Sequence, residues 1–215
     1  PGGRSSVERV GEYARSLPEI ERFVLLLPAG VEGPPEPEAV RLESQSIIEL
    51  LGRLEKLAEG YDNLFYFFAD CPLLDREVTG RLLDNHRRYY ADYTFADGYP
   101  LGIAPELLKP SILAPMRKLA EAMGGEAPRA GERGALFEVI KKDINAFDIE
   151  TELAPVDMRL LRLSLSADSK RNFLLVDRLV GAGAKDAESA CRLIQERPEL
   201  LRTLPAFFSI QIVEG

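Results

Sequence analysis

Short, wholly apolar stretches alternate along the chain with longer stretches in which apolar residues recur every three or four positions. Residues 23–27 and 64–69 are the apolar stretches, and such runs are typical of strands buried on both faces of a parallel sheet. Helical spacing predicts helices at 7–17, 47–58, 75–90, 111–123, 135–146, 173–180 and 187–202. This alternation predicts a three-layer α/β/α fold with a mainly parallel sheet.

Two hydroxyl–carboxylate pairs mark expected helix starts. Ser5 with Glu8, and Ser46 with Glu49, have the spacing of capping boxes, in which each side chain bonds the other residue's amide. Both pairs stand directly before residues with helical spacing, so they support the first two predicted helices.

Other segments carry weaker signals. Four prolines and four glutamates make residues 28–43 an expected exposed loop. Residues 92–95 are β-prone, and 101–108 are expected to lead into a short helix. Alternating apolar and polar residues predict an edge or antiparallel strand at 160–166, and the apolar residues 207–213 predict a final strand.

Charge and composition limit which kinds of binding partner the chain can have. The 215 residues include 27 Lys and Arg against 35 Asp and Glu, giving a formal net charge of −8. This balance argues against nucleic acid or an anionic membrane as the main partner, and no apolar stretch approaches the ~20 residues that span a bilayer. Two cysteines cannot make a disulfide framework and no signal-peptide pattern is present, so we expect a cytoplasmic protein. The chain begins with Pro1 rather than Met, which we interpret as a processed chain or a fragment.

Two aspartates stand out because each follows an expected strand and precedes an expected helix. Asp70 comes directly after residues 64–69, and Asp168 follows residues 160–166. Ligands of open α/β sheets bind beyond the carboxyl ends of the strands, and Mg²⁺ is typically held by one or two carboxylates plus substrate phosphates. Asp70 and Asp168 are therefore candidate Mg²⁺ ligands. The alternative is that each one caps the helix that follows it.

The residues before the first helix are a candidate nucleotide-binding segment. Gly2, Gly3 and Arg4 lead into that helix, and backbone amides at a helix N-terminus hold phosphate well. The Gly-Lys-Ser/Thr signature of a phosphate-binding Walker loop is missing. A plain turn is the commoner meaning of such a segment.

The turn after residues 92–95 is a second candidate binding segment. Asp97, Gly98 and Tyr99 form a turn whose carboxylate and ring could line a substrate pocket, although a turn with an exposed tyrosine is commoner. His86, among polar residues, is expected at the surface. Cys71 has no recognisable histidine base beside it, so a buried small residue is favoured over a thiolate nucleophile.

Residues 67–75, Phe-Phe-Ala-Asp-Cys-Pro-Leu-Leu-Asp, resemble the strand–Asp–x–Pro–Leu segment of nucleotidyltransferases with the nucleotide-diphospho-sugar transferase (GT-A-like) fold. Sugar cytidylyltransferases are the most similar subgroup. Residues 161–168 resemble that family's later strand, and residues 1–10 resemble the segment that leads into its first helix. The resemblance implies that Asp70 and Asp168 bind the divalent metal and that the ligand is a nucleotide or nucleotide sugar.

Two departures from the family's pattern bear on catalytic competence. The family's first strand and its Gly-rich, basic nucleotide loop would precede Pro1. After Asp168 the chain reads Ser-Lys-Arg-Asn, where the family usually has a further acidic residue.

A second resemblance concerns most of the chain. Residues 93–102, 167–173 and 205–212 resemble the N-terminal region of spirochaete radical SAM proteins that carry a SPASM domain. In those proteins this region leads into a cysteine cluster that binds an iron–sulfur centre, whereas Cys71 and Cys191 are too few and too far apart to form one. The resemblance implies a downstream radical SAM domain of the same polypeptide.

These resemblances lead to a domain division and two functions. We expect a nucleotidyltransferase-like domain at 1–180 and, at 181–215, a helical extension with a strand that leads toward the downstream domain. The first function is nucleotide or nucleotide-sugar binding with metal-dependent nucleotidyl transfer. The alternative is a degenerate, non-catalytic module that recognises a substrate or serves as a scaffold for the radical SAM enzyme.

Overall fold

The described part of the chain in the computed structural model covers residues 3–18, 20–28, 30–33, 37–155, 157–159 and 162–202. The expected strand at 207–213 and the candidate phosphate-binding residue Gly2 lie outside the described residues.

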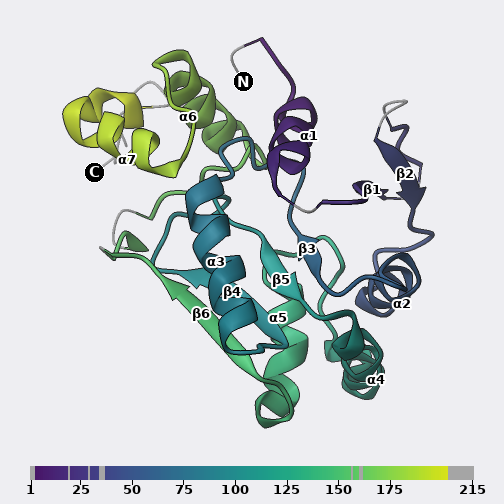
Figure 1. The fold of residues 1–215 in the computed structure, drawn as a ribbon. Helices are drawn as coiled ribbons and strands as arrows, with labels where there is room; N and C mark the ends of the chain where they lie inside the picture. The colour runs from purple at the N-terminus through teal and green to yellow at the C-terminus, as the bar shows by residue number, and fades with distance from the viewer. Residues whose placement is uncertain are drawn as a thin grey trace, which may run out of the picture.

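Helices and strands alternate along the chain, as the pattern of apolar residues predicts (Figure 1). The α-helices are α1 (Ser6–Ser16), α2 (Ile47–Leu57), α3 (Arg76–Arg88), α4 (Leu113–Met123), α5 (Ala135–Ile140), α6 (Lys170–Gly181) and α7 (Ala187–Glu196). The strands are β1 (Val24–Leu27), β2 (Glu38–Arg41), β3 (Leu64–Tyr66), β4 (Tyr93–Asp97), β5 (Glu106–Leu108) and β6 (Ile149–Leu153). Short 3₁₀ helices are η1 (Pro110–Ile112), η2 (Gly124–Glu126), η3 (Lys141–Ala146) and η5 (Pro198–Leu201). Among the described residues, no helix combines the length and apolar character needed to cross a membrane.

The strands form two sheets in the described part of the chain. β1 and β2 pair in parallel, and the second sheet has the order β3, β5, β4, β6. β5 runs antiparallel to both of its neighbours, whereas β4 and β6 are parallel. Consequently β3, β4 and β6 run in one direction, with β5 reversed between β3 and β4. The predicted α/β class is confirmed, and the sheet is parallel apart from β5.

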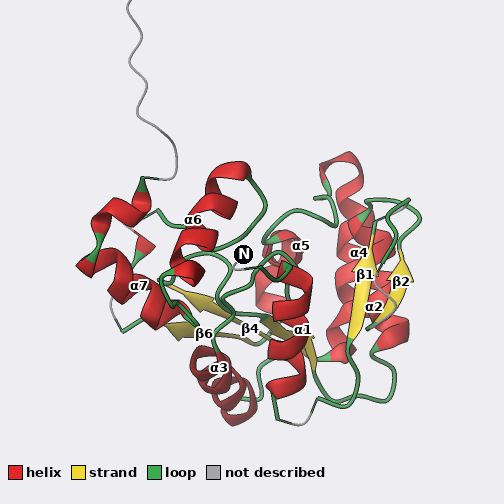
Figure 2. Cartoon of the chain, turned by 90° about the horizontal axis from the view of Figure 1, so that it is seen from above, coloured by secondary structure: helices red, strands yellow, loops and turns green. Residues whose placement is uncertain are grey.

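Alternate residues of β4 face two different helical layers. The rings of Tyr93 and Phe95 contact the ring of Phe137 of α5, with centroids 6.0 and 5.1 Å away. The intervening Thr94 bonds His86 of α3 on the other face. Figures 1 and 2 show α3 and α5 on opposite sides of this sheet. Because successive side chains of a strand point to opposite faces, this arrangement gives the predicted α/β/α layering.

Side-chain caps set where the first helices begin. Ser5 and Glu8 form the predicted capping box, with the Glu8 amide donating to Ser5 Oγ at 3.2 Å and the Ser5 amide to Glu8 Oε2 at 2.7 Å. Ser46 caps α2 as predicted. Its Oγ accepts the Ile48 amide and not the Glu49 amide, and the carboxylate of Glu49 accepts two amides of the preceding loop, so the second predicted capping box is wrong although the cap residue is right.

Several segments differ from the sequence-based expectation. The expected loop 28–43 contains β2, whose polar and mostly exposed residues carry no apolar run. Residues 101–108 end in the unexpected strand β5, and the short 3₁₀ helix η1 follows it as expected. β6 escapes prediction because its sequence, Ile-Glu-Thr-Glu-Leu, is short and half charged. In the expected strand 160–166, the described residues 162–166 have only an isolated bridge at Ser164.

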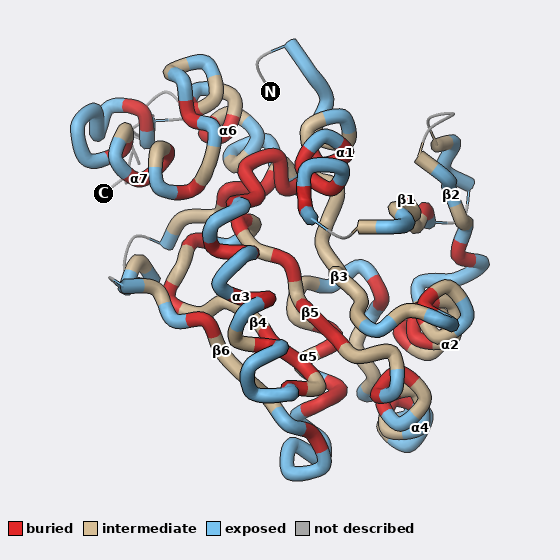
Figure 3. The backbone as a smooth tube through the Cα atoms, in the orientation of Figure 1, coloured by how far each residue is buried: buried red, intermediate tan, exposed pale blue. Residues whose placement is uncertain are grey.

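Buried residues concentrate on β4, β5 and the inner sides of the helices (Figure 3). The largest cluster packs α2, α4 and α5 against β4 and β5, and a second joins α6 and α7 to Leu73 and Ile103. Asp75 connects the starts of α3 and α7. Its Oδ1 caps α3, and its Oδ2 accepts the Ala187 amide at the start of α7 at 3.2 Å. One buried carboxylate therefore orders the starts of two helices.

His86 is buried, which corrects the expectation of a surface residue. Only 2% of it is exposed, and its Nδ1 lies 2.8 Å from Thr94 Oγ1 and its Nε2 3.1 Å from Asn63 Oδ1. Because the amide oxygen of Asn63 only accepts, Nε2 carries the proton and Nδ1 accepts from the Thr94 hydroxyl. Burial lowers the pKa of His86 to about 4.

Protonation of His86 is expected to destabilise the fold. The pKa of the group is 6.5 in ordinary surroundings and about 4 when folded, so the unfolded chain binds the proton first. The stabilisation by the neutral ring is complete above pH 6.5 and is lost as the pH falls through 4. Relative to His86→Gln, the native chain should lose on the order of 2 kcal/mol of unfolding free energy between pH 7 and 4, measured by urea denaturation.

Glu106 provides a control, because its contribution to stability should change with pH in the opposite direction to that of His86. Burial raises the pKa of its carboxyl to about 7, and the hydrogen bond from the Tyr93 hydroxyl at 2.8 Å offsets part of that rise. Stabilisation from a carboxyl of this kind is complete below its ordinary pKa of 4.5 and is lost as the pH rises through 7. The stability of the native chain relative to Glu106→Gln should therefore fall with rising pH. Parallel pH profiles for the His86 and Glu106 variants would contradict both assignments.

Candidate functional site

Asp70 and Asp168 come together around one cation, the guanidinium of Arg133. Arg133 Nη2 donates to both carboxylate oxygens of Asp70 at 2.7 Å. Arg133 Nε lies 3.5 Å from Asp168 Oδ2, and Nη1 donates to the Cys71 sulfur at 3.2 Å. The two aspartates that the sequence singles out thus share a site, and an arginine that it does not single out joins them.

Asp70 reaches this site from a turn beyond β3. The strand ends at Tyr66, three residues earlier than the apolar run suggests, and a turn closed by a bond from the Cys71 amide to the Phe68 carbonyl follows. The Asp70 carbonyl accepts the Ala167 amide at 2.7 Å. That bond fixes the segment carrying Asp168 against the segment carrying Asp70.

Gly102 allows the two aspartate-bearing segments to approach each other. A Cβ at this position would lie 3.2 Å from the Cys71 sulfur and 3.2 Å from the Leu165 backbone. Gly102 also has φ +90°, a conformation that residues with a side chain rarely adopt. Any larger residue would push Cys71 and Leu165 apart, and with them Asp70 and Asp168.

Arg133 is presented by the loop before α5. The bond from the Ala130 amide to the Gln45 carbonyl, at 2.9 Å, anchors this loop beside the start of α2. Gly134, at φ +74°, turns the chain directly into α5. The guanidinium carbon of Arg133 lies 4.6 Å from the centroid of the Phe68 ring, so a cation–π contact supports the side chain.

The site favours the charged forms of Arg133 and Asp168 and the neutral form of Cys71. Burial alone would lower the pKa of Arg133, but the neighbouring Cys71 and Asp70 raise it, so the guanidinium stays cationic. Burial would raise the pKa of Asp168, yet hydrogen bonds from Asn172 and Ser166 and the charge of Arg133 lower it overall. Burial raises the pKa of Cys71 to about 12. Cys71 is therefore a buried thiol at neutral pH, as the sequence favours, and not a thiolate nucleophile.

The helix-capping alternative for the two aspartates is wrong. Asp75, not Asp70, caps α3, and Ser169, not Asp168, caps α6 by accepting the Asn172 amide at 3.2 Å. Neither Asp70 nor Asp168 caps a helix, so helix capping does not explain why both carboxylates lie beside Arg133.

Mg²⁺ is compatible with this pair of carboxylates. The described residues contain no group of three or more His, Cys, Asp or Glu side chains that could hold a metal, but Mg²⁺ commonly takes only one or two carboxylates and completes its shell with water and phosphate. Asp70 and Asp168 would hold the ion, with Arg133 displaced from between them.

Arg4 is engaged away from this site. Its Nη1 donates to Glu12 Oε1 at 2.6 Å on the exposed side of α1. Gly3 has φ +79° and lies just before the cap Ser5, so a turn occupies this segment. The phosphate-binding role of Gly3 and Arg4 remains a prediction.

The turn of Asp97, Gly98 and Tyr99 belongs to a second polar cluster. Asp97 accepts the Gly98 amide at 2.8 Å and faces Arg159 at 3.3 Å. The Tyr99 hydroxyl accepts from Arg81 Nη2 at 3.0 Å and lies 3.3 Å from a Glu152 carboxylate oxygen. Tyr99 is half-buried rather than exposed, and in the described structure no hydrogen bond or ion pair joins this turn to Asp70 or Asp168.

Sequence reasoning missed Arg133 because its signal is faint. The residue is a lone cation in the segment Gly131-Glu132-Arg133-Gly134, which the composition identifies only as a break between helices. Its partner Asp70 lies 63 positions away. No local spacing connects the two.

Three solved structures superpose on most of this chain and share its fold. A cytidylyltransferase from Leptospira borgpetersenii superposes with a TM-score of 0.73 at 13% identity, covering 96% of this chain and 90% of its own. The chain has the fold of a cytidylyltransferase. A 2-C-methyl-D-erythritol 4-phosphate cytidylyltransferase from Thermus thermophilus superposes with a TM-score of 0.57 at 15% identity, covering 84% of this chain and 90% of its own. A Mycobacterium sp. strain JC1 homologue of Mycobacterium tuberculosis rv0371c also gives 0.57, at 14% identity and 90% and 87% coverage.

Sequence relatives match only part of the chain. No protein-family model matches it. One uncharacterised protein of Treponema pallidum is 43% identical over 80 residues, and another is 33% identical over 66 residues. These matches cover 37% and 31% of this chain, and 21% and 30% of the relatives' own lengths. Similarity to uncharacterised spirochaete proteins is therefore shown over about a third of the chain, whereas the link to a radical SAM domain and the division at residue 180 remain predictions.

Removing the arginine should free the carboxylates for a metal. We expect Arg133→Met to bind Mn²⁺, used as a probe for Mg²⁺, ~5-fold more tightly than the native chain, equivalent to the ~1 kcal/mol of a partly exposed ion pair. Electron paramagnetic resonance of free Mn²⁺ measures this affinity. Arg133→Lys keeps the cation without the fork of donors and should stay near the native value. Equal or weaker Mn²⁺ binding by a folded Arg133→Met variant would count against a metal site here.

Proposed function

We propose that the chain binds a nucleotide or nucleotide sugar where Asp70, Asp168 and Arg133 meet. The observation that carries the proposal is the convergence of two carboxylates and one arginine from distant segments, beyond the carboxyl end of β3, in a chain with a cytidylyltransferase fold. Nucleotide phosphates bind where such sheets present their carboxyl ends.

The charge of the cluster explains how it would take a phosphate. Arg133 offsets one of the two carboxylates, so one formal negative charge remains. That residual charge attracts a divalent cation, and the cation then makes the cluster net positive and attractive to phosphate. When bound, Mg²⁺ supplies charge neutralisation on the phosphate oxygens.

Arg133 has the chemistry to change partners in that process. Its Nη2 donates to both oxygens of the Asp70 carboxylate in the present structure, and the planar set of guanidinium donors also suits a phosphate. Asp168, whose pKa is lowered, stays ionised over the neutral range. We therefore assign Asp70 and Asp168 to the metal and Arg133 to the phosphate in the ligand-bound state.

The reaction that fits these roles is nucleotidyl transfer. An oxygen of an acidic sugar or of a phosphate attacks the α-phosphate of a nucleoside triphosphate, and pyrophosphate leaves. Binding in the correct geometry and neutralising charge supply most of the catalysis in such phosphoryl chemistry. The Arg133 cluster is assigned to metal and phosphate, so it does not select the base, the sugar or the acceptor.

A second candidate function is supported by the same cluster. The Asp70–Arg133 contact is already a satisfied ion pair, which suits a degenerate module that recognises a ligand without transforming it. Such a module would serve a radical SAM domain of the same polypeptide. The two functions differ in turnover and not in binding.

Calorimetry with CTP or UTP, with and without MgCl₂, tests the shared part of both functions. We expect binding that depends on Mg²⁺ and weakens at least tenfold in Asp70→Asn, since a tenfold change is about 1.4 kcal/mol. Asp84→Asn changes an exposed carboxylate on α3 and is the matched control, with affinity close to native. Pyrophosphate release on adding sugar acids or sugar phosphates would favour the enzyme, and binding without release would favour the module. No nucleotide binding with intact folding would exclude both.

A further inference from the structure

Phe68 supports two members of the Arg133 cluster at once. The guanidinium carbon of Arg133 lies over the Phe68 ring, 4.6 Å from its centroid. The Phe68 carbonyl accepts the Cys71 amide at 3.2 Å and so closes the turn that carries Asp70. The side chain of Phe68 therefore contacts the cation, while its backbone orders the carboxylate that the cation binds.

The contact with the Phe68 ring uses none of the N–H donors of Arg133. Nη2 donates to both oxygens of Asp70 at 2.7 Å, Nη1 donates to the Cys71 sulfur at 3.2 Å, and Nε lies 3.5 Å from Asp168 Oδ2. The N–H groups of a guanidinium lie in its plane, whereas an aromatic ring attracts a cation through the face of the ring. Because the two kinds of contact use different parts of the group, the donors can change partner while the ring contact persists.

Tyr66 braces the Phe68 ring. The two rings meet edge to face, with centroids 5.6 Å apart and planes at 72°. The Tyr66 hydroxyl donates to the Ala130 carbonyl at 3.4 Å, in the loop that presents Arg133. Burial and then the charge of Glu106 raise the pKa of Tyr66, so the hydroxyl stays protonated and remains a donor. Tyr66 thus connects the ring beneath the guanidinium to the loop from which Arg133 projects.

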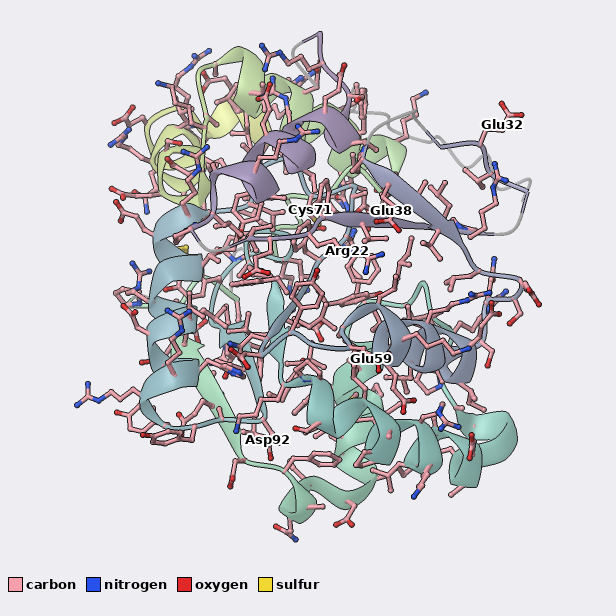
Figure 4. The ribbon with its side chains drawn as sticks, turned by 45° about the vertical axis from the view of Figure 1, so that its right-hand side comes forward. Arg22, Glu32, Glu38, Glu59, Cys71 and Asp92 are labelled. Carbon is pink, nitrogen blue, oxygen red and sulfur yellow. The ribbon has the colours of Figure 1, made fainter. Side chains whose placement is uncertain are left out.

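The uncharged groups around the guanidinium belong to the packed interior. Tyr66 is the last residue of β3 and lies opposite Glu106 of β5 in the sheet. Tyr66 and Phe68 have the spacing of residues on one side of an extended chain. Cys71, whose sulfur accepts from Arg133, is buried and lies inside the molecule (Figure 4). These groups are held by the fold, so they do not depend on what the aspartates bind.

We propose that Phe68, braced by Tyr66, is a positioning residue that keeps the Arg133 guanidinium in place while its donors pass from the aspartates to a phosphate. This inference rests on the proposed function, in which Arg133 changes partners. Ordering a free arginine side chain costs conformational entropy. Because the ring holds the guanidinium in both states, phosphate binding does not incur that cost again. Phe68 therefore strengthens phosphate binding and leaves metal binding to the aspartates.

NMR spectroscopy of the arginine Nε–Hε groups tests whether the guanidinium stays on the ring. The ring current of Phe68 should displace the Arg133 signal in the native chain relative to Phe68→Leu, and Arg133→Lys identifies the signal because it removes it. We expect the difference between the native chain and Phe68→Leu to persist after MgCl₂ is added and again after CTP or UTP is added. A difference that disappears with either addition would mean that the guanidinium leaves the ring, and the proposal would be overturned.

Binding affinities separate a positioning role from a merely structural one. Phe68→Leu should bind the nucleotide with Mg²⁺ about threefold more weakly than the native chain, which corresponds to the loss of one cation–π contact. Mn²⁺ alone should bind it with native affinity, because both aspartates remain. Phe68→Tyr keeps the ring face and should restore nucleotide affinity. Tyr89→Leu removes an exposed ring that lies 5.4 Å from the guanidinium carbon of Arg88, and this matched control should have native affinity for both ligands.

Two further variants test the route through Arg133. Tyr66→Phe, which removes only the hydroxyl, should give part of the loss in nucleotide affinity. In an Arg133→Met background, Phe68→Leu should cause no further loss, because the group that it positions is gone. An undiminished loss in that background would overturn the proposal.

The remaining outcomes distinguish this inference from the proposed function. Weaker binding of Mn²⁺ together with the nucleotide would mean that Phe68 only maintains the turn of Asp70, and the positioning role would be wrong. Native nucleotide affinity in Phe68→Leu would overturn this inference alone and leave the proposed function standing. No nucleotide binding by the folded native chain would exclude the proposed function and this inference with it.

Discussion

The ion-pair cluster of Arg133 with Asp70 and Asp168 holds the candidate site together. Each member comes from a loop, and the three loops follow β3, precede α5 and precede α6. Charges that are only partly exposed interact strongly enough to order loops when several of them share one site. The bond from the Ala167 amide to the Asp70 carbonyl and the close approach at Gly102 limit how far the loops can separate. The cluster therefore connects three loops at the place where we propose that the ligand binds.

The reversed strand β5 determines which surfaces are left to the helices. It lies between β3 and β4, so Leu107 faces α3 while Leu108 faces the cluster formed with α4 and α5. The side chains of Tyr93 and Thr94 in β4 likewise point to these two opposite faces of the sheet. This two-sided burial anchors one half of the molecule. β1 and β2 form a separate two-stranded sheet, whereas α2 packs with α4 in the same buried cluster as β4 and β5.

Much of the fold could be predicted because helical periodicity and capping are local. α1 and α2 begin at the serines that their spacing singles out, since a cap needs only the next three residues. β2 and β6 were beyond such reasoning, because their polar sequences become strands only through pairing with β1 and β4. His86 looks like a surface residue in its polar neighbourhood, and it is buried because Thr94 and Asn63 satisfy both ring nitrogens from other elements.

The sequence alone determined the alternation of helices and strands and the two aspartates worth testing, since both follow from residues close in the chain. The tertiary structure decided what those aspartates do, because Arg133 reaches Asp70 across 63 positions and only folding brings opposite charges that far apart into contact. It also decided that Asp75 and Ser169, and not the two candidates, cap the neighbouring helices. A cap is chosen by backbone direction at the helix start, and that direction depends on how the preceding loop packs.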